Sequence, residues 1–266
     1  MTEAEQERPA SEGEPKRHAW ITGASSGLGR ALALKMASEG WQVTASARSG
    51  DQLQSLAALA AAFPGAVHAL PLDVTRRDAV AAAVEQMVQG HGLPDLVVLN
   101  AGTHKPTPAA QLAAQDFQEL IELNLMGTVN CLEAVLPPLR GRGRGQIALV
   151  ASLAGYVGLP LAGAYGMTKA GLINLAEALR PELEAEGIVL QVVNPGFVKT
   201  PLTDKNPFEM PFLMEVEDAA AAFYDGLQAR RFEIIFPRRF AYLLKILRLL
   251  PYPLALAMTR KLLPKG

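Results

Sequence analysis

The sequence predicts an α/β protein built on a doubly wound, mainly parallel sheet of seven strands with helices on both faces. Short apolar stretches alternate with longer amphipathic ones, a glycine-rich turn follows the first of them, and no linker interrupts the pattern from residue 18 to 237. Continuous apolar strands are typical of sheets covered on both faces, and right-handed crossovers make such a sheet doubly wound. Candidate site residues are therefore expected beyond the carboxyl ends of the strands.

The seven expected strands are short apolar runs, and helix-like periodicity fills the segments between them. The strands are expected at residues 18–22, 41–47, 66–73, 95–100, 145–152, 188–194 and 231–236. The helices are expected at residues 27–40, 51–62, 75–90, 115–138, 163–186 and 215–229. The Gly-Arg repeat at 141–145 lies between a helix and a strand and is interpreted as a solvated turn.

Composition and charge narrow the class of protein. The net charge of −1 lacks the basic balance of a nucleic-acid binder, and no apolar stretch has the length of an ordinary membrane-spanning helix. Residues 1–17 are acidic and nearly free of large apolar groups, which predicts a disordered leader rather than a signal peptide. The single cysteine, Cys131, lies in an apolar run and fits a reducing compartment, so a cytoplasmic location is expected.

No metal site is expected from the four histidines. His18, His68, His91 and His104 show no metal-ligand spacing with each other or with the cysteine. His104 follows an Asn-Ala-Gly-Thr stretch and is interpreted as an exposed loop residue, with substrate contact as the alternative.

The glycine turn after the first strand predicts a dinucleotide site. Gly23, Gly27 and Gly29 are spaced G-x-x-x-G-x-G where the first strand leads into a helix. Glycine permits the sharp turn and the close approach of a pyrophosphate, and the amides of the following helix stabilise the anion. The candidate cofactor-binding residues of this turn are Gly23, Ser25, Ser26, Gly27, Leu28 and Gly29.

The end of the second strand predicts which dinucleotide is used. An acidic residue at this position binds the ribose hydroxyls of NAD, whereas an arginine accommodates the 2′-phosphate of NADP. Here the strand ends on Arg48 with no carboxylate at its tip, and Ser25 and Ser49 can add hydrogen bonds. NADP(H) is therefore favoured over NAD(H).

Tyr165 and Lys169 are four residues apart in a helix-like segment, so their side chains leave the same face one turn apart. By itself this pair also fits an ordinary surface helix. Ser152 lies thirteen residues before Tyr165, and Asn124 lies earlier still.

These residues together resemble the short-chain dehydrogenase/reductase family, in its shorter single-domain branch. The matching stretches are TGASSGLG (22–29), LDVT (72–75), NAG (100–102), Asn124, Ser152, YGMTK (165–169) and NPGFVKT (194–200). They follow the family's order from residue 18 to about 200. The resemblance implies a single Rossmann-type catalytic domain over 18–237 and a homodimer or homotetramer.

The resemblance also implies roles for single residues. Asn124, Ser152, Tyr165 and Lys169 would be the catalytic set. Asp73 and Val74 would contact the adenine, and the remaining cofactor-binding residues would be Asn100, Ala101, Gly102, Tyr165, Lys169, Pro195, Gly196, Val198 and Thr200.

The chemistry of carbonyl reduction explains why these residue types are needed. Tyrosine, with an ordinary pKa of about 10, is an acid at neutral pH, and a neighbouring Lys169 ammonium favours the tyrosinate. Lys169 can also hold the nicotinamide ribose, and Ser152 can donate to the carbonyl oxygen. For Asn124, the resemblance implies that it positions a water for proton relay.

Two stretches beyond these motifs are expected to shape the substrate end. Residues 201–218 contain Pro, Phe and Met and are interpreted as a lid over an apolar substrate, with an apolar connection or subunit contact as alternatives. Residues 238–266 are predicted to be a basic amphipathic extension. From Ile234 onward the chain has seven Lys or Arg and no acid, which leaves −8 on the rest of a chain whose total is −1.

Helical spacing divides the first part of this extension into two sides. Phe240, Leu243, Leu244, Leu247 and Leu250 form an apolar stripe, and Arg238, Lys245 and Arg248 lie largely opposite. Three interpretations stay open: the extension contacts a membrane through residues 238–263, roofs the substrate pocket, or packs on another subunit.

The expected function is that of an NADP(H)-dependent oxidoreductase that interconverts a hydrophobic alcohol and its ketone or aldehyde, with Tyr165 as general acid and base. The alternative is a non-catalytic dinucleotide-binding sensor or scaffold, against which the intact catalytic set argues. The expected partner is a small-molecule substrate, and no nucleic acid is expected.

Overall fold

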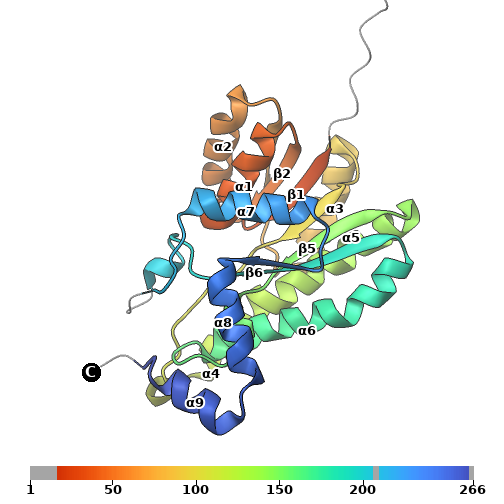
Figure 1. Cartoon of the computed structure of the whole chain (residues 1–266). Helices are drawn as coiled ribbons and strands as arrows, with labels where there is room; N and C mark the ends of the chain where they lie inside the picture. The colour runs from red at the N-terminus through yellow and green to blue at the C-terminus, as the bar shows by residue number, and fades with distance from the viewer. Residues whose placement is uncertain (1–16, 206–209, 264–266) are drawn as a thin grey trace, which may run out of the picture.

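The computed structural model describes residues 17–205 and 210–263, and seven of its strands form one sheet between layers of helices (Figure 1). The strands are β1 (His18–Thr22), β2 (Gln42–Ala47), β3 (Ala66–Pro71), β4 (Leu96–Leu99), β5 (Gly145–Val150), β6 (Ile188–Pro195) and β7 (Glu233–Phe236). Their order is β3-β2-β1-β4-β5-β6-β7, and every pairing is parallel. The predicted doubly wound, seven-stranded sheet is confirmed.

The helices cover the two faces of the sheet. They are α1 (Gly27–Ser38), α2 (Gly50–Leu59), α3 (Arg77–His91), α4 (Ala114–Leu120), α5 (Gly127–Arg142), α6 (Gly163–Ala185), α7 (Val216–Gln228), α8 (Arg238–Leu249) and α9 (Tyr252–Arg260). Apolar residues of α1, α2 and α7 join one buried cluster, and those of α3, α5 and α6 join the other. Because the winding reverses between β1 and β4, a crevice is expected where their carboxyl ends meet.

The two cores follow from the alternation of side chains along each strand. In β1, Trp20 belongs to the cluster with α3 and α5, whereas its neighbours Ala19 and Ile21 belong to the cluster with α1 and α7. All five residues of β1 are buried. A central strand of this kind has no polar face, which explains the continuous apolar runs in the sequence.

The expected helix at 115–138 is divided into three segments in the structure. Between α4 and α5 lies one turn of π-helix, η3 (Ile121–Met126), and α5 continues through Pro137 and Pro138 as far as Arg142. Apolar periodicity does not distinguish α from π turns, so the sequence does not show the break. Because α5 extends to Arg142, only Gly143 and Arg144 of the Gly-Arg repeat form the expected turn. Gly143 has a φ of +67° and ends the helix.

The regions at the two ends of the chain match the predictions in part. The expected leader at residues 1–17 lies outside the described residues except for Arg17, and four residues of the expected lid, 206–209, lie outside them too. The expected extension forms two helices, α8 and α9. In Figure 1, α8 runs downward from just below β6, and α9 lies at the bottom of the view. Among the described residues, none of the helices has the length and apolar character to cross a membrane.

Candidate active site

A cleft with a volume of about 580 Å³ opens at the carboxyl ends of the central strands. Its walls come from the segments that follow β1, β2, β4, β5 and β6, together with the start of α6 and the inner side of α8. Every residue expected to bind cofactor or to act in catalysis lines this cleft except Asn124. Segments far apart in the sequence therefore meet in one place.

The glycine turn is packed so closely that side chains cannot be accommodated in it. Gly23 has a φ of +67°, and a Cβ on it would lie 2.7 Å from the Cα of Ala101. A Cβ on Gly29 would lie 2.5 Å from the side-chain amide nitrogen of Asn100 and 2.5 Å from the Gly23 carbonyl oxygen. These glycines let the start of α1 approach the end of β4. The N-cap residue of α1, Ser26, makes no side-chain hydrogen bond to the first turn, and the residues that begin this turn line the cleft.

Asn100 holds the glycine turn against the end of β4. Its side-chain amide donates to the carbonyl oxygens of Thr22 and Gly23 at 3.0 and 3.1 Å. In return, the Thr22 hydroxyl accepts from the backbone amides of Asn100 and Ala101 at 3.0 and 3.1 Å. The two loops that form the cleft floor are thus joined by four hydrogen bonds, which positions the turn before any ligand binds.

Arg48 and Asp73 lie at the end of the cleft beyond β2 and β3. Arg48 is exposed, and its positive charge reaches Asp73. Asp73 accepts from the backbone amide and the hydroxyl of Thr75 at 3.0 and 2.8 Å. Burial opposes the Asp73 charge, but the hydrogen bonds from Thr75 and the charges of Arg48 and Arg76 prevail and lower its pKa. The neighbouring Val74 is buried, and its carbonyl oxygen accepts from Asn130 at 2.9 Å.

Tyr165 and Ser152 face each other across the middle of the cleft. Burial raises the pKa of the Tyr165 phenol, and a hydrogen bond from Ser152 opposes this change. Ser152 is itself held in place, because its hydroxyl oxygen accepts from the Ala154 amide at 3.1 Å. The phenol is therefore protonated at neutral pH, with a hydroxyl donor beside it.

Lys169 lies one helical turn after Tyr165, as the spacing predicts. Its side chain is buried, and its ammonium donates to the carbonyl oxygen of Val150 at 2.7 Å. The Nζ lies 5.6 Å from the centre of the Tyr165 ring. Burial lowers the pKa of Lys169 to about 8. An ammonium has three donors, so two remain for other partners in the cleft.

Asn124 lies behind the cleft wall, on the π turn, with none of its surface exposed. Its amide nitrogen donates to the Thr103 carbonyl and to the Thr168 hydroxyl, both at 3.0 Å, and its oxygen accepts from the Thr103 amide at 2.8 Å. The extra residue of the π turn aims this side chain at the loop that follows β4. Both protons of the Asn124 side-chain amide are used, so a water would have to donate to an oxygen atom of Asn124.

The segment after β6 supplies the wall opposite the glycine turn. Pro195, Gly196, Val198 and Thr200 line the cleft, and Val198 pairs with Met214 in an isolated bridge. The carbonyl oxygen of Val198 accepts from the hydroxyls of Thr200 and Thr203 at 3.3 and 2.7 Å. These bonds fix the turn from which the expected lid begins, and Pro201 and Leu202 of that segment line the cleft as well.

The extension after residue 237 contributes to the cleft, which the sequence left open. Phe240 and Leu244 of α8 lie in its wall. The Phe240 ring is stacked on Phe197, with centroids 5.6 Å apart, and on Phe212, with centroids 5.7 Å apart. Three aromatic rings, from the segment after β6, the expected lid and α8, are therefore stacked beside this part of the cleft. The apolar stripe predicted on α8 was wrong at one residue. Leu243 was expected on it but is 53 % exposed, whereas Ala241 is buried.

Two other sequence-based interpretations change at this site. His104 is not simply exposed: it lines the cleft, and its ring meets the Tyr165 ring edge-on at 4.9 Å. Its position directly after the Asn-Ala-Gly-Thr stretch was the signal for the alternative of substrate contact. Lys245, expected on the solvated side of α8, instead forms an ion pair with Glu233 of β7.

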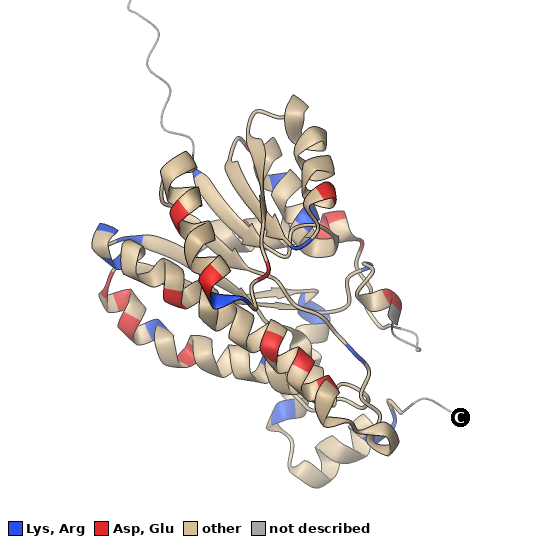
Figure 2. Cartoon of the chain, turned by 180° about the vertical axis from the view of Figure 1, so that it is seen from behind, with Lys and Arg blue, Asp and Glu red and all other residues tan. Residues whose placement is uncertain are grey.

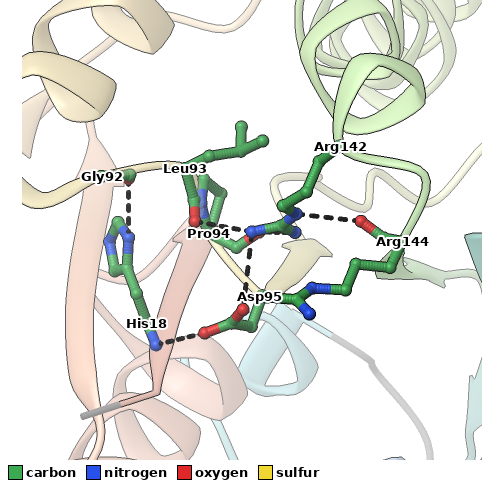
Figure 3. Close-up of polar contacts among 7 residues, drawn as sticks. All are labelled: His18, Gly92, Leu93, Pro94, Asp95, Arg142 and Arg144. Carbon is green, nitrogen blue, oxygen red and sulfur yellow. Dashed lines mark hydrogen bonds and ion pairs between the residues drawn. The ribbon is translucent and has the colours of Figure 1, made fainter. Parts of the chain in front are cut away.

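The amino ends of the strands, at the other edge of the sheet, carry a different polar group (Figure 3). The backbone amide of His18 donates to Asp95 at 3.0 Å, and its ring bonds the Gly92 carbonyl at 3.0 Å. Arg142 donates to the carbonyl oxygens of Leu93 and Pro94 at 3.0 and 2.7 Å. These contacts fasten the end of α5 to the loop before β4. Among the described residues, no group of three acidic, histidine or cysteine side chains is arranged to hold a metal ion.

Comparisons with known proteins agree with this geometry. Residues 17–210 match the family model of the short chain dehydrogenases. An uncharacterised oxidoreductase of Myxococcus xanthus is 41 % identical over 246 residues, which cover 92 % of this chain and 97 % of the relative. FabG, the 3-oxoacyl-(acyl-carrier-protein) reductase of Thermotoga maritima, is 37 % identical over 187 residues, covering 70 % of this chain and 76 % of FabG.

A solved structure shows the same likeness in three dimensions. The short-chain dehydrogenase from Sphingobium yanoikuyae in complex with NADPH superposes with a TM-score of 0.76 at 31 % identity, covering 83 % of this chain and 88 % of that one. The family model ends at residue 210, so α7, α8 and α9 lie beyond the part that matches it.

Proposed function

Because the chain belongs to the short-chain dehydrogenase family, we propose that it is an NADP(H)-dependent oxidoreductase that interconverts a hydrophobic alcohol and its ketone or aldehyde. One observation carries this proposal. A protonated Tyr165, a Ser152 donor and a buried Lys169 ammonium lie together in one cleft, beside a glycine turn at a helix N-terminus. This combination supplies a proton, a binding site for an oxygen, and a cation to control the proton donor.

The residues of the cleft fit a dinucleotide. A Cβ on Gly23 or Gly29 would clash with Ala101, with the side chain of Asn100 or with the Gly23 carbonyl oxygen, so glycine is needed for the turn that lines the cleft at the start of α1. Helix N-termini of this kind bind pyrophosphate. Gly23, Ser25, Ser26, Gly27, Leu28 and Gly29 would hold the phosphates, Asp73 and Val74 the adenine, and Pro195, Gly196, Val198 and Thr200 the nicotinamide. When bound, the nicotinamide supplies or accepts the hydride.

The chain's own residues would donate the proton to the substrate and accept it back. In the reducing direction Tyr165 donates the phenolic proton to the substrate oxygen, where negative charge develops, and Ser152 donates a hydrogen bond to the same oxygen. The Lys169 ammonium stabilises the tyrosinate left behind. In the oxidising direction the same groups act in reverse. Asn124 supports the site by holding the Thr103 loop and the Thr168 hydroxyl of α6.

Arg48 supports NADP(H) as the favoured cofactor. Arg48 is exposed directly after β2, and the Asp73 carboxylate, which its charge reaches, already accepts hydrogen bonds from Thr75. A guanidinium matches the geometry of a phosphate. The solved relative from Sphingobium, which was determined with NADPH, has the same fold.

The apolar wall supports a hydrophobic substrate. Phe197, Phe240 and Leu244 line the cleft on the side away from Arg48, and the rest of that wall includes Leu153, Leu159 and Leu161. Such a surface gains by excluding water from an apolar chain or ring. The FabG relative is named as a reductase of a 3-oxoacyl group, which is a carbonyl on an aliphatic chain.

The proposal also includes a cellular location and an oligomeric state. We expect a cytoplasmic enzyme, because a chain with the single cysteine Cys131 fits a reducing compartment. That thiol is buried, and burial raises its pKa to about 12, which makes it unreactive. We also expect a homodimer or homotetramer, as in the family it belongs to. The alternative of a non-catalytic sensor is not favoured, because it has no use for the combined Ser152, Tyr165 and Lys169.

Replacing Tyr165 by Phe tests the proposal. The variant should reduce apolar ketones with NADPH about 10²–10⁴-fold more slowly, since it lacks the proton donor, yet bind NADPH with nearly unchanged affinity. Turnover is followed by NADPH absorbance, and binding by NADPH fluorescence. The matched control is Tyr242→Phe, on the outer side of α8, which should keep full turnover. Wild-type protein that binds NADPH but turns over no member of a panel graded by chain length and ring size would instead indicate a sensor.

A further inference from the structure

The outer side of α8 and α9 exposes an unusual number of large apolar side chains. We define the outer face by six of them, which are 52–84 % exposed: Tyr242, Ile246, Leu249, Tyr252, Leu256 and Met258. Tyr242, Ile246 and Leu249 follow one another at helical spacing on one side of α8. Large apolar side chains exposed together on neighbouring helices indicate a binding surface.

The opposite side of α8 is apolar too. Ala241, Leu244 and Leu247 are buried against the core. The ion pair between Lys245 and Glu233 holds the helix in this orientation, and Glu233 also accepts from Tyr156 and Asn194. A helix with apolar residues on every side is normally covered on every side. None of the described residues covers the outer face, so its partner lies outside the part of the chain that the structure describes.

The charge around the outer face identifies the partner. Arg238, Arg239, Arg248, Arg260 and Lys261 are all exposed, and no salt bridge joins them to a carboxylate in the part of the chain that the structure describes. No Asp or Glu occurs after Glu233. In Figure 2 the two helices accordingly carry blue and tan but no red. The partner should therefore be both apolar and negatively charged.

A second copy of this chain does not meet that requirement. If two outer faces packed on each other, each cation would meet cations of the same sign, with no acid on either helix to pair with them. An anionic bilayer meets it fully, because phosphates and anionic headgroups bind the arginines while acyl chains receive the leucine and methionine side chains. Exposed tyrosines, here Tyr242 and Tyr252, are typical of the zone between these layers.

We propose that the outer face of α8 and α9 docks this protein on an anionic lipid surface, lying in the interface without crossing it. The two helices are 12 and 9 residues long and separated by Pro251, which suits surface attachment. Phe240 and Leu244 on the inner side of the same helix line the cleft, so docking brings the apolar end of the cleft next to the lipid. This second consequence, unlike the docking, rests on the proposed function.

Vesicle flotation with the full-length protein tests the docking. The protein should float with vesicles of equimolar phosphatidylcholine and phosphatidylglycerol and not with phosphatidylcholine alone. The triple variant Ile246→Gln, Leu249→Gln, Tyr252→Gln should lose binding. The double variant Arg238→Gln, Arg239→Gln should bind about 30-fold more weakly, since each basic residue near an anionic surface contributes on the order of 1 kcal/mol.

The matched control changes exposed apolar residues elsewhere. Leu59→Gln combined with Phe63→Gln, at the far end of the molecule by α2, should leave flotation unchanged. Reduction of a small water-soluble ketone by each variant shows that it is folded, and in this way failure of docking is separated from failure of the proposed reaction. The proposal is overturned if wild-type protein floats with neither vesicle. It is also overturned if the triple variant floats as well as wild type, or changes only the number of subunits by analytical ultracentrifugation.

Discussion

Lys169 carries an ammonium that the fold keeps away from water, with 4 % of its surface exposed. Its ammonium donates a hydrogen bond to the Val150 carbonyl. Desolvation disfavours the charged form, so the pKa of Lys169 falls from 10.5 to about 8. The residue is thus placed where it suits the chemistry of Tyr165 and not where it would stabilise the fold.

Replacing Lys169 by Met should reveal the free-energy cost of burying the Lys169 charge. Between pH 8 and 10.5 the unfolded chain binds a proton that the folded chain has released, so wild-type stability rises with pH over this range. At pH 7 the burial of the charge costs about 3 kcal/mol. The variant should therefore unfold at higher urea concentration than wild type near pH 7, with an advantage that shrinks toward pH 10.5, while turnover is lost. A pH-independent difference would contradict this account.

A single substitution also tests the proposed role of Arg48 in binding the 2′-phosphate of NADPH. Arg48→Asp removes the exposed cation at the end of β2 and adds a negative charge. Affinity for NADPH, measured by fluorescence titration, should fall about 10–100-fold, as expected for a lost charge-assisted hydrogen bond, while affinity for NADH should be nearly unchanged. Arg144→Asp, which makes the same charge change at the other edge of the sheet in Figure 3, is the control. Equal losses for both cofactors would refute the assignment of the 2′-phosphate to Arg48.

Two elements behave in ways that their own sequences do not reveal. The π turn η3 lies within a long helix-like stretch, and its purpose is visible only in the contacts of Asn124 with Thr103 and Thr168. Helix α8 has apolar residues on both sides, and only packing decides that Ala241 and Leu247 face inward while Tyr242 faces outward. In both cases the neighbouring element, and not the local pattern, selects the orientation.

The three-ring stack at the substrate end should control the size of substrate. Phe240→Ala removes the central ring, which contacts Phe197 and Phe212. The KM for a bulky apolar ketone should rise about ten-fold, since an aromatic pair contributes about 1 kcal/mol beyond its buried area, whereas NADPH affinity should not change. Tyr242→Ala, on the same helix but facing outward, should leave the KM unaltered. If both variants raise the KM equally, α8 acts through general stability and not through this wall.

At the scale of the whole molecule, the two edges of the sheet carry different groups of polar residues. The cleft lies at the carboxyl ends of the strands, and a histidine group lies at the amino ends, where His68 stacks on His91 with ring centroids 3.9 Å apart and His18 is 6.1 Å from His91. The sequence spacing of these histidines does not bring them together, but the parallel strands and α3 do. Burial lowers the pKa of His18 to about 4, against the opposing effects of the Gly92 carbonyl and Asp95.

This burial predicts acid sensitivity for the fold. Below pH 6.5 the unfolded chain protonates His18, but the folded chain resists protonation until about pH 4, so stability falls as the pH drops through this window. His68, whose pKa is also lowered by burial, adds to the effect. Replacing His18 by Gln should flatten the dependence of urea unfolding on pH between about pH 7 and pH 4.5, by up to about 1.4 kcal/mol per pH unit. An unchanged slope would show that other groups dominate.

Much of the site could be predicted because its residues have strict local requirements. A glycine with positive φ, such as Gly23, and a Tyr–Lys pair one helical turn apart leave a direct trace in the sequence. Phe197, Phe240 and His104 could not be assigned to the cleft in this way: substrate contact was only the alternative for His104, and a roof over the pocket was one of three interpretations of the helix that carries Phe240. They contact the cleft from three separate segments.

The amino-acid sequence by itself determined the order of strands and helices, the glycine turn and the Tyr165–Lys169 spacing, because alternation, periodicity and backbone freedom are properties of neighbouring residues. Only the tertiary structure decided that α8 roofs the cleft with Phe240 and leaves Ile246 and Leu249 exposed. The reason is physical: both sides of that helix are apolar, so the side that is buried depends on the surface against which it packs. The Lys245–Glu233 pair, which joins α8 to the edge strand β7, holds that choice in place.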